Sequence, residues 1–278
     1  MTIREALRLA AARLEQAGVP DADVDAAYLL ASVLKEDTLA MRINGHRELA
    51  APQRAAFDAL CDRRAAREPL QYILGETEFM GLTFHVEPGV LIPRADTEIL
   101  VEKALAWMKP GARVLDIGTG SGAIAVSLAK LGRPAQVTAV DVSDRALEIA
   151  RRNAERNGAA VEFVKSDCFS ALKGRKYDMI VSNPPYISED EMRGLMPEVT
   201  REPELALFGG ADGLDFYRRI SREAPEYLNE GGCLLFEIGW LQKDAVSALV
   251  KAHIGEPFAL RDYGQNWRVV GAKKEGAC

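Results

Sequence analysis

The chain has 278 residues, of which 48% are hydrophobic, and 35 Lys and Arg against 41 Asp and Glu give a formal net charge of −6. This composition excludes a disordered or collagen-like chain, and the length favours two domains or one domain with an extension. The mild acidity argues against a protein that coats DNA, because such proteins are usually strongly basic.

The cysteine spacing predicts neither a metal site nor a disulfide framework. No two cysteines have the CxxC spacing of zinc sites, so we expect reduced thiols. The four lie far apart, at Cys61, Cys168, Cys233 and Cys278. No apolar run approaches the roughly 18 residues of a membrane helix, and acidic residues interrupt the N-terminal arginines, unlike in a transit peptide. We expect a soluble, cytoplasmic protein with no membrane partner.

Residues 1–70 are predicted to form a small all-helical domain. Thr2 and Glu5 make a capping box, a second helix is expected from Asp21, and a third from 52 to 67 begins with a proline in its first turn. This third helix carries four arginines, for which a solvated face is favoured over a face that binds an acidic partner. They are Arg54, Arg63, Arg64 and Arg67.

The sequence pattern changes from helical to β-rich between residues 71 and 92. Short β-rich runs at 72–74, 82–86 and 90–92 are separated by glycines and a proline. Such punctuation is typical of hairpins, so this segment is predicted to be a β-hairpin linker between two domains.

Residues 93–278 alternate predicted strands and helices, the pattern of a doubly wound, Rossmann-like α/β domain with a parallel sheet. Strands are expected at 113–117, 136–140, 161–165, 179–182 and 233–238, and the clearest helices at 144–157 and 212–227. A helix at 241–252 precedes two more strands at 258–261 and 267–272. Their five-residue connection is too short for a crossover helix, so these terminal strands should form an antiparallel hairpin.

A glycine-rich turn follows the first of these strands and is the candidate cofactor site. It consists of Gly118, Thr119, Gly120, Ser121 and Gly122. Glycines there let the backbone approach a ligand at the carboxyl end of the strand, and Asp141, at the end of the next strand, can hydrogen-bond a ribose diol. Asp116 would repel the pyrophosphate of NAD but suits the ammonium group of S-adenosylmethionine. The alternative for Asp116 is an aspartate that caps the turn.

Two residues after the third strand are candidates for the adenine. Asp167 has a position similar to that of the residue that meets the adenine amino edge in class I methyltransferases. Phe169 is equally compatible with stacking on the adenine ring and with an ordinary place in the core. Together with Asp116, these features favour S-adenosylmethionine, which would leave as S-adenosylhomocysteine.

The fourth strand delivers Asn183, Pro184, Pro185 and Tyr186 at its carboxyl end. Two consecutive prolines hold an extended, rigid turn. The Asn183 side-chain oxygen and the Pro184 carbonyl can accept the two hydrogens of an NH₂ group and aim its lone pair at a methyl donor. Tyr186 can cover a flat substrate group or lie near the sulfonium. The motif predicts methylation of a nitrogen in a planar group.

Over nearly its whole length the sequence resembles the HemK-type family, the N(5)-glutamine methyltransferases of peptide chain release factors. The resemblance rests on the N-terminal helical region and on segments 91–98, 116–122, 183–186, 198–203, 209–214 and 268–270. The four-residue turn alone is shared with DNA adenine methyltransferases and is similar to motifs of RNA guanine methyltransferases.

The resemblance implies that the substrate is the glutamine of the Gly-Gly-Gln loop of a release factor. Asn183 and the Pro184 carbonyl would hold its amide, Pro185 and Tyr186 would pack beside it, and the helical domain would grip the factor elsewhere. Relatives often have tryptophan in place of Phe169, and Arg94 is typical of the family without a role that we can derive.

Two alternatives remain on sequence grounds. A DNA or RNA amino-nitrogen methyltransferase shares the chemistry but needs a basic track, which the net charge of −6 does not support, so no direct nucleic-acid partner is expected. A nucleotide-binding oxidoreductase or a binding module is disfavoured by Asp116 and by the Asn183 turn.

Overall fold

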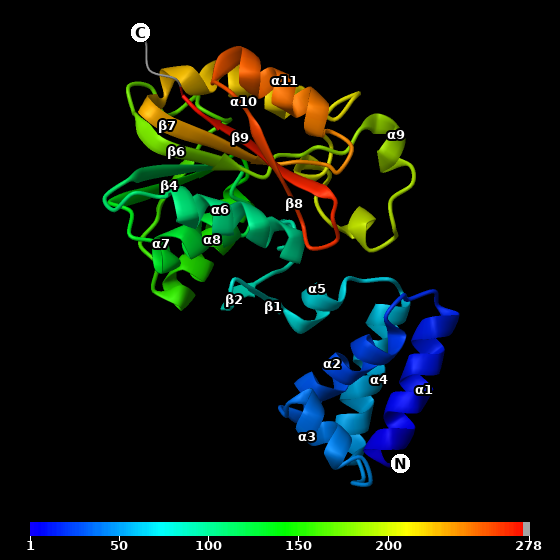
Figure 1. Ribbon diagram of the computed structural model, residues 1–278. Helices are drawn as coiled ribbons and strands as arrows, with labels where there is room; N and C mark the ends of the chain where they lie inside the picture. Colours follow the sequence, from blue (N-terminus) through cyan, green and yellow to red (C-terminus); the bar gives the residue numbers. More distant parts are fainter. Residues whose placement is uncertain (275–278) are drawn as a thin grey trace. The chain divides into compact units, whose positions relative to one another are not determined.

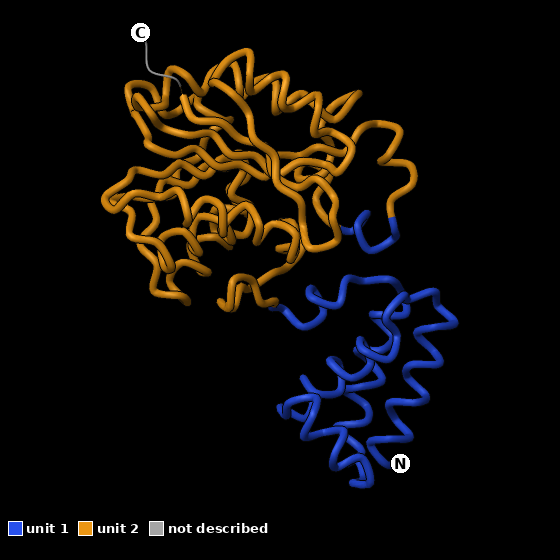
Figure 2. Tube along the Cα trace, viewed as in Figure 1, with its two compact units in different colours: residues 1–76, 196–201 blue, residues 77–195, 202–278 orange. Residues whose placement is uncertain are grey.

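The computed structural model describes residues 1–274 and divides into two compact units, coloured separately in Figure 2. The helical unit comprises Met1–Glu76 together with Met196–Arg201, and the α/β unit comprises Thr77–Leu195 and the chain from Glu202 onward. A six-residue segment from late in the sequence thus belongs to the N-terminal unit.

The helical unit packs amphipathic helices around one apolar core. Its helices are α1 Ile3–Gln16, α2 Ala22–Leu34, α3 Thr38–Ile43, α4 Ala51–Ala65 and α5 Leu70–Leu74 (Figure 1). The predicted capping box is confirmed, because Thr2 Oγ1 accepts the Glu5 N–H at 3.3 Å and Glu5 Oε2 accepts the Thr2 N–H at 2.9 Å. The buried side of α1 consists of residues three or four apart, as helical periodicity requires: Ile3, Ala6, Ala10 and Leu14.

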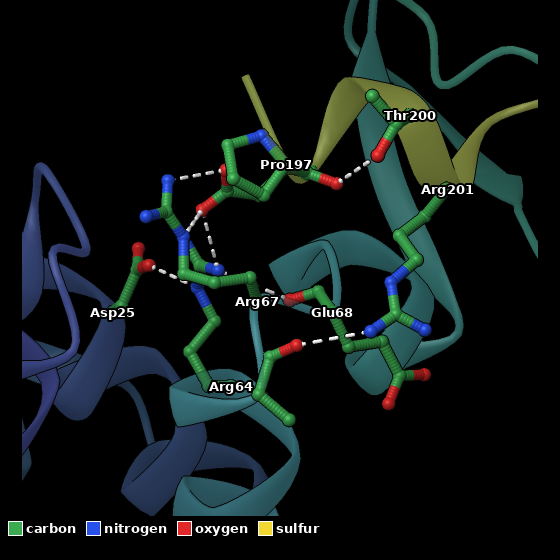
Figure 3. Close-up of polar contacts among 9 residues, drawn as sticks. Asp25, Arg64, Arg67, Glu68, Pro197, Thr200 and Arg201 are labelled. Atoms are coloured by element: carbon green, nitrogen blue, oxygen red, sulfur yellow. Dashed lines mark hydrogen bonds and ion pairs between the residues drawn. The ribbon is translucent and has the colours of Figure 1, made fainter. Parts of the chain in front are cut away.

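A buried ion network joins the late segment to this unit (Figure 3). Arg64 Nε donates to Asp25 at 2.7 Å and Arg64 Nη1 to Glu198 at 2.9 Å, while Arg67 makes two further bonds of 2.6 Å to Glu198. The expectation of a solvated arginine face on α4 is therefore wrong for Arg64, whose side chain is 6% exposed. A helical pattern identifies which residues share a face but not that a charged partner will cover it.

The strand expected at residues 72–74 is instead the short helix α5. Pro69 precedes it, Gly75 ends it in a left-handed conformation with φ +79°, and Tyr72 and Ile73 are buried. A run of three apolar residues fits a buried helix as well as a strand, so periodicity could not decide. The hairpin is consequently shorter than residues 71–92: it pairs β1 Glu76–Phe79 with β2 Leu82–His85, and residues 90–92 form no strand.

The α/β unit contains a seven-stranded sheet in the order β5-β4-β3-β6-β7-β9-β8 (Figure 1). The strands are β3 Arg113–Ile117, β4 Gln136–Asp141, β5 Glu162–Lys165, β6 Tyr177–Ser182, β7 Leu228–Glu237, β8 Phe258–Arg261 and β9 Trp267–Lys273. β3 to β7 run parallel, and β9 is antiparallel to both β7 and β8. The parallel sheet and its antiparallel terminal hairpin are thus confirmed, with β9 inserted beside β7.

Helices cover both faces of this sheet (Figure 1). They are α6 Glu98–Trp107, α7 Ala123–Leu131, α8 Asp144–Asn157, α10 Asp215–Glu223 and α11 Lys243–His253. Shorter helices of this unit are η1 Ala95–Thr97, α9 Glu189–Met192, η3 Glu204–Ala206 and η4 Ala224–Glu226, whereas η2 Val199–Arg201 belongs to the helical unit. On β3, Val114 joins the core beneath α6 and α7, whereas Leu115 and Ile117 join the core beneath α10 and α11. A central parallel strand buried on both faces reads as a continuous apolar run, which is why the sequence identified it.

The topology brings two predicted segments together. β3 has β4 on one side and β6 on the other, so the chain reverses its order at this point of the sheet. Ligands of open α/β sheets bind at such a switch point, outside the carboxyl ends of the strands. The glycine-rich turn after β3 and Asn183 after β6 therefore lie at the same edge.

Three of the cysteines are buried free thiols, namely Cys61, Cys168 and Cys233, and Cys278 lies outside the described residues. Burial raises the pKa of Cys61 and Cys233 to about 12 and that of Cys168 to about 11. Across residues 1–274, each helix is too short or too polar to cross a membrane.

Candidate active site

A hollow opens at the carboxyl ends of the parallel strands of the α/β unit. Among its lining residues are seven that the sequence predicted for the site: Gly118, Gly120, Asp141, Asp167, Asn183, Pro184 and Pro185. Apolar side chains complete the lining, including Val142 directly after β4 and Leu205 and Phe216 from the chain that follows β6. Such a concave, mainly apolar site with a few polar groups is typical of small-molecule binding.

The glycine-rich turn is held against the sheet from below. Gly118 N–H and Thr119 N–H both donate to the Val140 carbonyl, at 2.9 and 3.0 Å. Gly122 has φ +83°, and a Cβ there would lie 3.0 Å from that of Ala150 in α8, so only glycine lets α7 start so close to α8. Thr119 and Ser121 are buried and support the turn, whereas Gly118 and Gly120 face the hollow.

Asp141 ties the end of β4 to this turn. Its Oδ2 accepts the Gly120 N–H and its Oδ1 the Ser143 N–H, both at 2.9 Å. Burial raises the pKa of Asp141 despite these bonds. The carboxylate is thereby fixed in orientation on the wall of the hollow, and each of its oxygens has a further lone pair for a hydroxyl donor.

Asp116 lies beneath the turn, and its side chain is completely buried. Oδ2 accepts the Thr119 hydroxyl at 2.7 Å, which supports the turn-capping role, but Oδ1 has no hydrogen-bond partner among the described residues. Burial raises the pKa of Asp116 to about 7. An unsatisfied carboxylate oxygen in a buried position is costly, and a cationic donor such as an ammonium group would satisfy it.

The two adenine candidates are placed differently. Asp167 lines the hollow, although its Oδ1 already accepts Arg219 Nη1 at 2.6 Å. Phe169 does not line it: the ring is 1% exposed and stacks on Tyr227 with centroids 4.4 Å apart. Of the two roles left open for Phe169, the structure therefore shows the place in the core, and its inclusion among the cofactor-binding candidates is wrong. Val142, 39% exposed beside Asp141, is the apolar side chain available at the wall.

Asn183 extends from the end of β6 and is braced by Thr97. Asn183 Nδ2 donates to Thr97 Oγ1 at 3.4 Å, a long bond, while Pro184 is buried next to it. A buried carboxylate, Glu237, stands at the end of the neighbouring strand β7. Sequence reasoning missed both Thr97 and Glu237. A lone ionisable residue that ends the apolar run Cys233–Phe236 was the signal for Glu237.

Tyr186 is fixed through contacts to its backbone carbonyl. Its carbonyl accepts Gln242 Nε2 at 2.9 Å, and burial raises the pKa of the phenol, which stays neutral. Gly213, with φ +74°, packs so closely that a Cβ there would stand 2.3 Å from the Tyr186 carbonyl oxygen. A Cβ on Gly209 would lie 2.6 Å from the Pro185 carbonyl oxygen. The glycine-rich segment 209–214 thus allows a second layer of backbone to pack behind the turn.

Arg94 now has a structural role. Its guanidinium pairs with Glu202, a buried carboxylate that also accepts the Ile92 N–H at 3.0 Å. This pair fixes the segment after the hairpin to the chain just before Pro203, Leu205 and Ala206, which line the hollow. Arg94 therefore shapes the wall.

Two family models match parts of this chain, and relatives match nearly all of it. Residues 5–75 match the family model described as the PrmC N-terminal domain, and residues 82–201 match that of the methyltransferase small domain. A release factor glutamine methyltransferase from Geobacter sulfurreducens is 46% identical over 274 residues, covering 98% of this chain and 96% of the relative. A relative of the same name from Cereibacter sphaeroides is 44% identical over 281 residues and covers 100% of both chains.

Solved structures show the same methyltransferase fold. A methyltransferase from Pyrococcus furiosus matches with a TM-score of 0.57 at 24% identity, over 71% of this chain and 91% of its own. The 16S rRNA N2 G1207 methyltransferase of T. thermophilus, in complex with AdoMet and guanosine, matches with a TM-score of 0.53 at 21% identity, over 72% of this chain and 50% of its own.

Proposed function

Because the chain belongs to the release factor glutamine methyltransferase family, we propose that it transfers a methyl group from S-adenosylmethionine to the side-chain amide nitrogen of a release-factor glutamine, the one in the Gly-Gly-Gln loop. One observation carries this proposal: Asn183, Pro184 and Pro185 line the same hollow as Gly118, Gly120 and Asp141. The proposed amide grip and the proposed cofactor turn thus face one space, in a chain 46% identical to a relative of that name.

The residues that line the hollow, with Asp116 buried beneath its glycine-rich turn, fit S-adenosylmethionine. Asp141 would accept the ribose hydroxyls, Val142 would cover the adenine, and Asp167 would face its amino edge. Asp116 would satisfy its free Oδ1 through the ammonium group, directly or through a water. When bound, S-adenosylmethionine supplies an electrophilic methyl group and remains as S-adenosylhomocysteine after the transfer.

The Asn183 side chain and the Pro184 carbonyl would orient the glutamine amide by accepting its two hydrogens. Tyr186 would cover the flat amide. Full loss of amide resonance costs about 18–20 kcal/mol, by analogy with peptide rotation, which two hydrogen bonds do not supply. In-line placement of the nitrogen is worth about 7–11 kcal/mol and is the larger contribution of the protein.

No general base is required by this scheme. An amide nitrogen becomes strongly acidic once methylated, so its extra proton can leave to water. Consistent with this, the described lining of the hollow includes no histidine.

We also propose a division of labour along the chain. The helical domain, residues 1–70, would bind the release factor away from the reacting loop, residues 71–92 would link the domains, and residues 93–278 would catalyse the transfer. The helical unit carries large apolar side chains on its surface, a feature of protein-binding sites. They are Leu9, Val24, Tyr28, Leu39 and Ile43. A release factor as partner implies a cytoplasmic location, and the net charge of −6 gives little support to a direct nucleic-acid partner.

A labelling experiment tests the proposal. Radiolabelled S-adenosylmethionine is offered with a release factor, with the same factor carrying Gln→Ala in its Gly-Gly-Gln loop, with duplex DNA and with ribosomal RNA. We expect label on the unmodified factor alone. Label on nucleic acid alone, or equal label on the Gln→Ala factor, would contradict the proposal.

A further inference from the structure

Glu237 is the last residue of β7 and lies beside the start of the amide-gripping turn. In the parallel pairing of β6 with β7, Ser182 is opposite Phe236, so Asn183 and Glu237 follow as neighbours at the edge of the sheet. Glu237 is 1% exposed. A carboxyl group thus stands, out of contact with solvent, next to the residue proposed to hold the substrate amide.

Glu237 is not fully satisfied by its surroundings. Burial raises its pKa to about 7, and hydrogen bonding from the Thr97 and Asn183 side chains together with the charge of Arg268 opposes that rise. Oε2 has no hydrogen-bond partner among the described residues. Ionisable groups perturbed in this way and adjacent to a cleft are common at functional sites.

The other charged and titratable groups around Glu237 come from several elements. Arg268 of β9 lies 2.9 Å from Asp96 of η1 and 3.1 Å from Asp262, so its charge is shared among carboxylates. Asp96 itself raises the pKa of Glu237. Tyr186 and Tyr217 also face Glu237, and the pKa of each phenol is raised, first by burial and also by the negative charge of Glu237.

The chemistry of an asparagine amide explains what a carboxylate can do here. The amide has an acceptor oxygen on one side and a donor NH₂ on the other, and a half-turn exchanges them. A substrate NH₂ must meet the oxygen. Thr97 accepts from Asn183 Nδ2 and keeps its own hydroxyl hydrogen, which the carboxylate of Glu237 can accept. An ionised Glu237 therefore favours the arrangement in which the Asn183 NH₂ points to Thr97 and the Asn183 side-chain oxygen points to the hollow.

We propose that Glu237 is a positioning residue that, through Thr97 and Asn183, keeps the Asn183 side-chain oxygen facing the hollow. This inference rests on the proposed function, because it concerns the orientation of Asn183, which is proposed to hold the substrate amide. Protonation or neutralisation of Glu237 removes an acceptor from this chain and permits the flipped amide, which would present hydrogens to the hydrogens of the substrate.

The test compares Glu237→Gln with two matched controls. Asp178→Asn removes a carboxylate at the opposite end of β6, where Asp178 accepts the Arg113 N–H, and Asp262→Asn removes a partner of Arg268. At saturating S-adenosylmethionine and release factor, we expect the single-turnover rate to fall at least tenfold in Glu237→Gln. We expect S-adenosylmethionine affinity to stay within about twofold and both controls to keep most of the wild-type rate.

The pH profile gives a readout that a structural role would not move. We expect the wild-type rate to rise with pH through about 7, the pKa of Glu237, and then to level. Glu237→Gln should lose this rise. A wild-type rate in Glu237→Gln, an unchanged pH rise, or an equal loss in Asp262→Asn would overturn the proposal.

Thr97 provides a second route if Glu237→Gln does not fold. Thr97→Val keeps the shape without the hydroxyl, whereas Thr97→Ser keeps the hydroxyl. We expect a loss of at least tenfold in Thr97→Val and near wild-type rates in Thr97→Ser, and equal rates in the two would overturn the proposal. If the wild type labels only nucleic acid, the proposed function fails, and the same variants test Glu237 on that substrate.

Discussion

Glu198 Oε1 lies 2.9 Å from Arg64 Nη1, although 134 positions separate the two residues in the chain. The guanidinium of Arg64 is 6% exposed and has Asp25 on its other side. Two carboxylates and two arginines thus share a mostly buried network inside the helical unit. A segment that follows the Asn183–Tyr186 turn by only about a dozen residues is in this way part of the N-terminal fold.

We predict that Glu198→Ala destabilises the helical unit. Removal of one partner from a buried ion network leaves a buried charge with less compensation, which lowers the free energy of unfolding. Because Asp25 still pairs with Arg64, we expect a loss of about 3 kcal/mol, at the low end for such a removal. Urea titration of the wild type and the variant measures this loss as a difference in the free energy of unfolding. Glu189→Ala is the matched control, because Glu189 pairs with Arg193 at a side-chain exposure of 64% and should change stability little. Equal effects of the two substitutions would contradict the buried network.

The same network predicts a pH dependence. Burial raises the pKa of Glu198, but hydrogen bonds from Arg67 and Arg64 outweigh it and lower the pKa from 4.5 to about 2. The stabilisation by Glu198 is therefore complete above pH 4.5 and is lost as the pH falls towards 2. We expect the stability difference between wild type and Glu198→Gln to shrink over that window. A difference that stays constant would indicate that Glu198 is not paired as a carboxylate.

S-adenosylmethionine binding should depend on the charge of Asp116. With a pKa of about 7 in the free protein, Asp116 is increasingly neutral at lower pH and attracts an ammonium group less. Between about pH 5.5 and 7, where the ammonium of the ligand stays charged, we expect the Kd to rise by up to about tenfold per unit as the pH falls. Isothermal titration calorimetry measures it. Asp116→Asn should bind weakly with no pH dependence, whereas a pH dependence retained in that variant would exclude Asp116 as its source.

Gly213→Ala should impair catalysis. Its Cβ would stand 2.3 Å from the Tyr186 carbonyl oxygen, so the backbone of the proposed amide grip must move. Gly231→Ala shares the strain of a positive φ, at +70°, but would meet no atom within 4 Å. We expect similar losses of stability from that strain, of about 1–2 kcal/mol, but a fall in methyl transfer of at least tenfold in Gly213→Ala alone. Equal transfer rates would show that the close packing does not position Tyr186.

Phe169→Leu should affect stability more than cofactor binding. The ring stacks on Tyr227 inside the core, so we expect a loss of about 1–2 kcal/mol in the free energy of unfolding. The Kd for S-adenosylmethionine should stay within about twofold. Stacking on adenine would instead be worth about 1–3 kcal/mol of binding. A tenfold rise in Kd without a loss of stability would restore that role to Phe169.

The sequence was most informative where the backbone determines position. Parallel strands bring their carboxyl ends to one edge, so the strands that precede Gly118 and Asn183 predicted that the two would share a site. The same reasoning predicted the antiparallel terminal strands, because five linking residues cannot make a crossover. These inferences need only periodicity and connection length.

Side-chain partners were not predictable in this way. Whether Phe169 faces the hollow or the core depends on the turn that carries it, and both choices satisfy an apolar pattern. Arg64 lies in a helix whose composition suggests solvent, and its second carboxylate comes from a distant segment. Glu237 could be singled out as unusual in an apolar strand, but its neighbours Thr97 and Arg268 come from other elements of the fold.

The segment Met196–Arg201 lies within the α/β region of the sequence but belongs to the helical unit, which limits how relatives can be recombined. A swap of the N-terminal region between relatives at a single crossover point would exchange Arg64 and Arg67 but leave the old Glu198 behind. Such chimaeras should fold well only when both parents have compatible charges at these three places. The helical unit consists of two separate stretches of sequence, so an exchange between relatives has to include both.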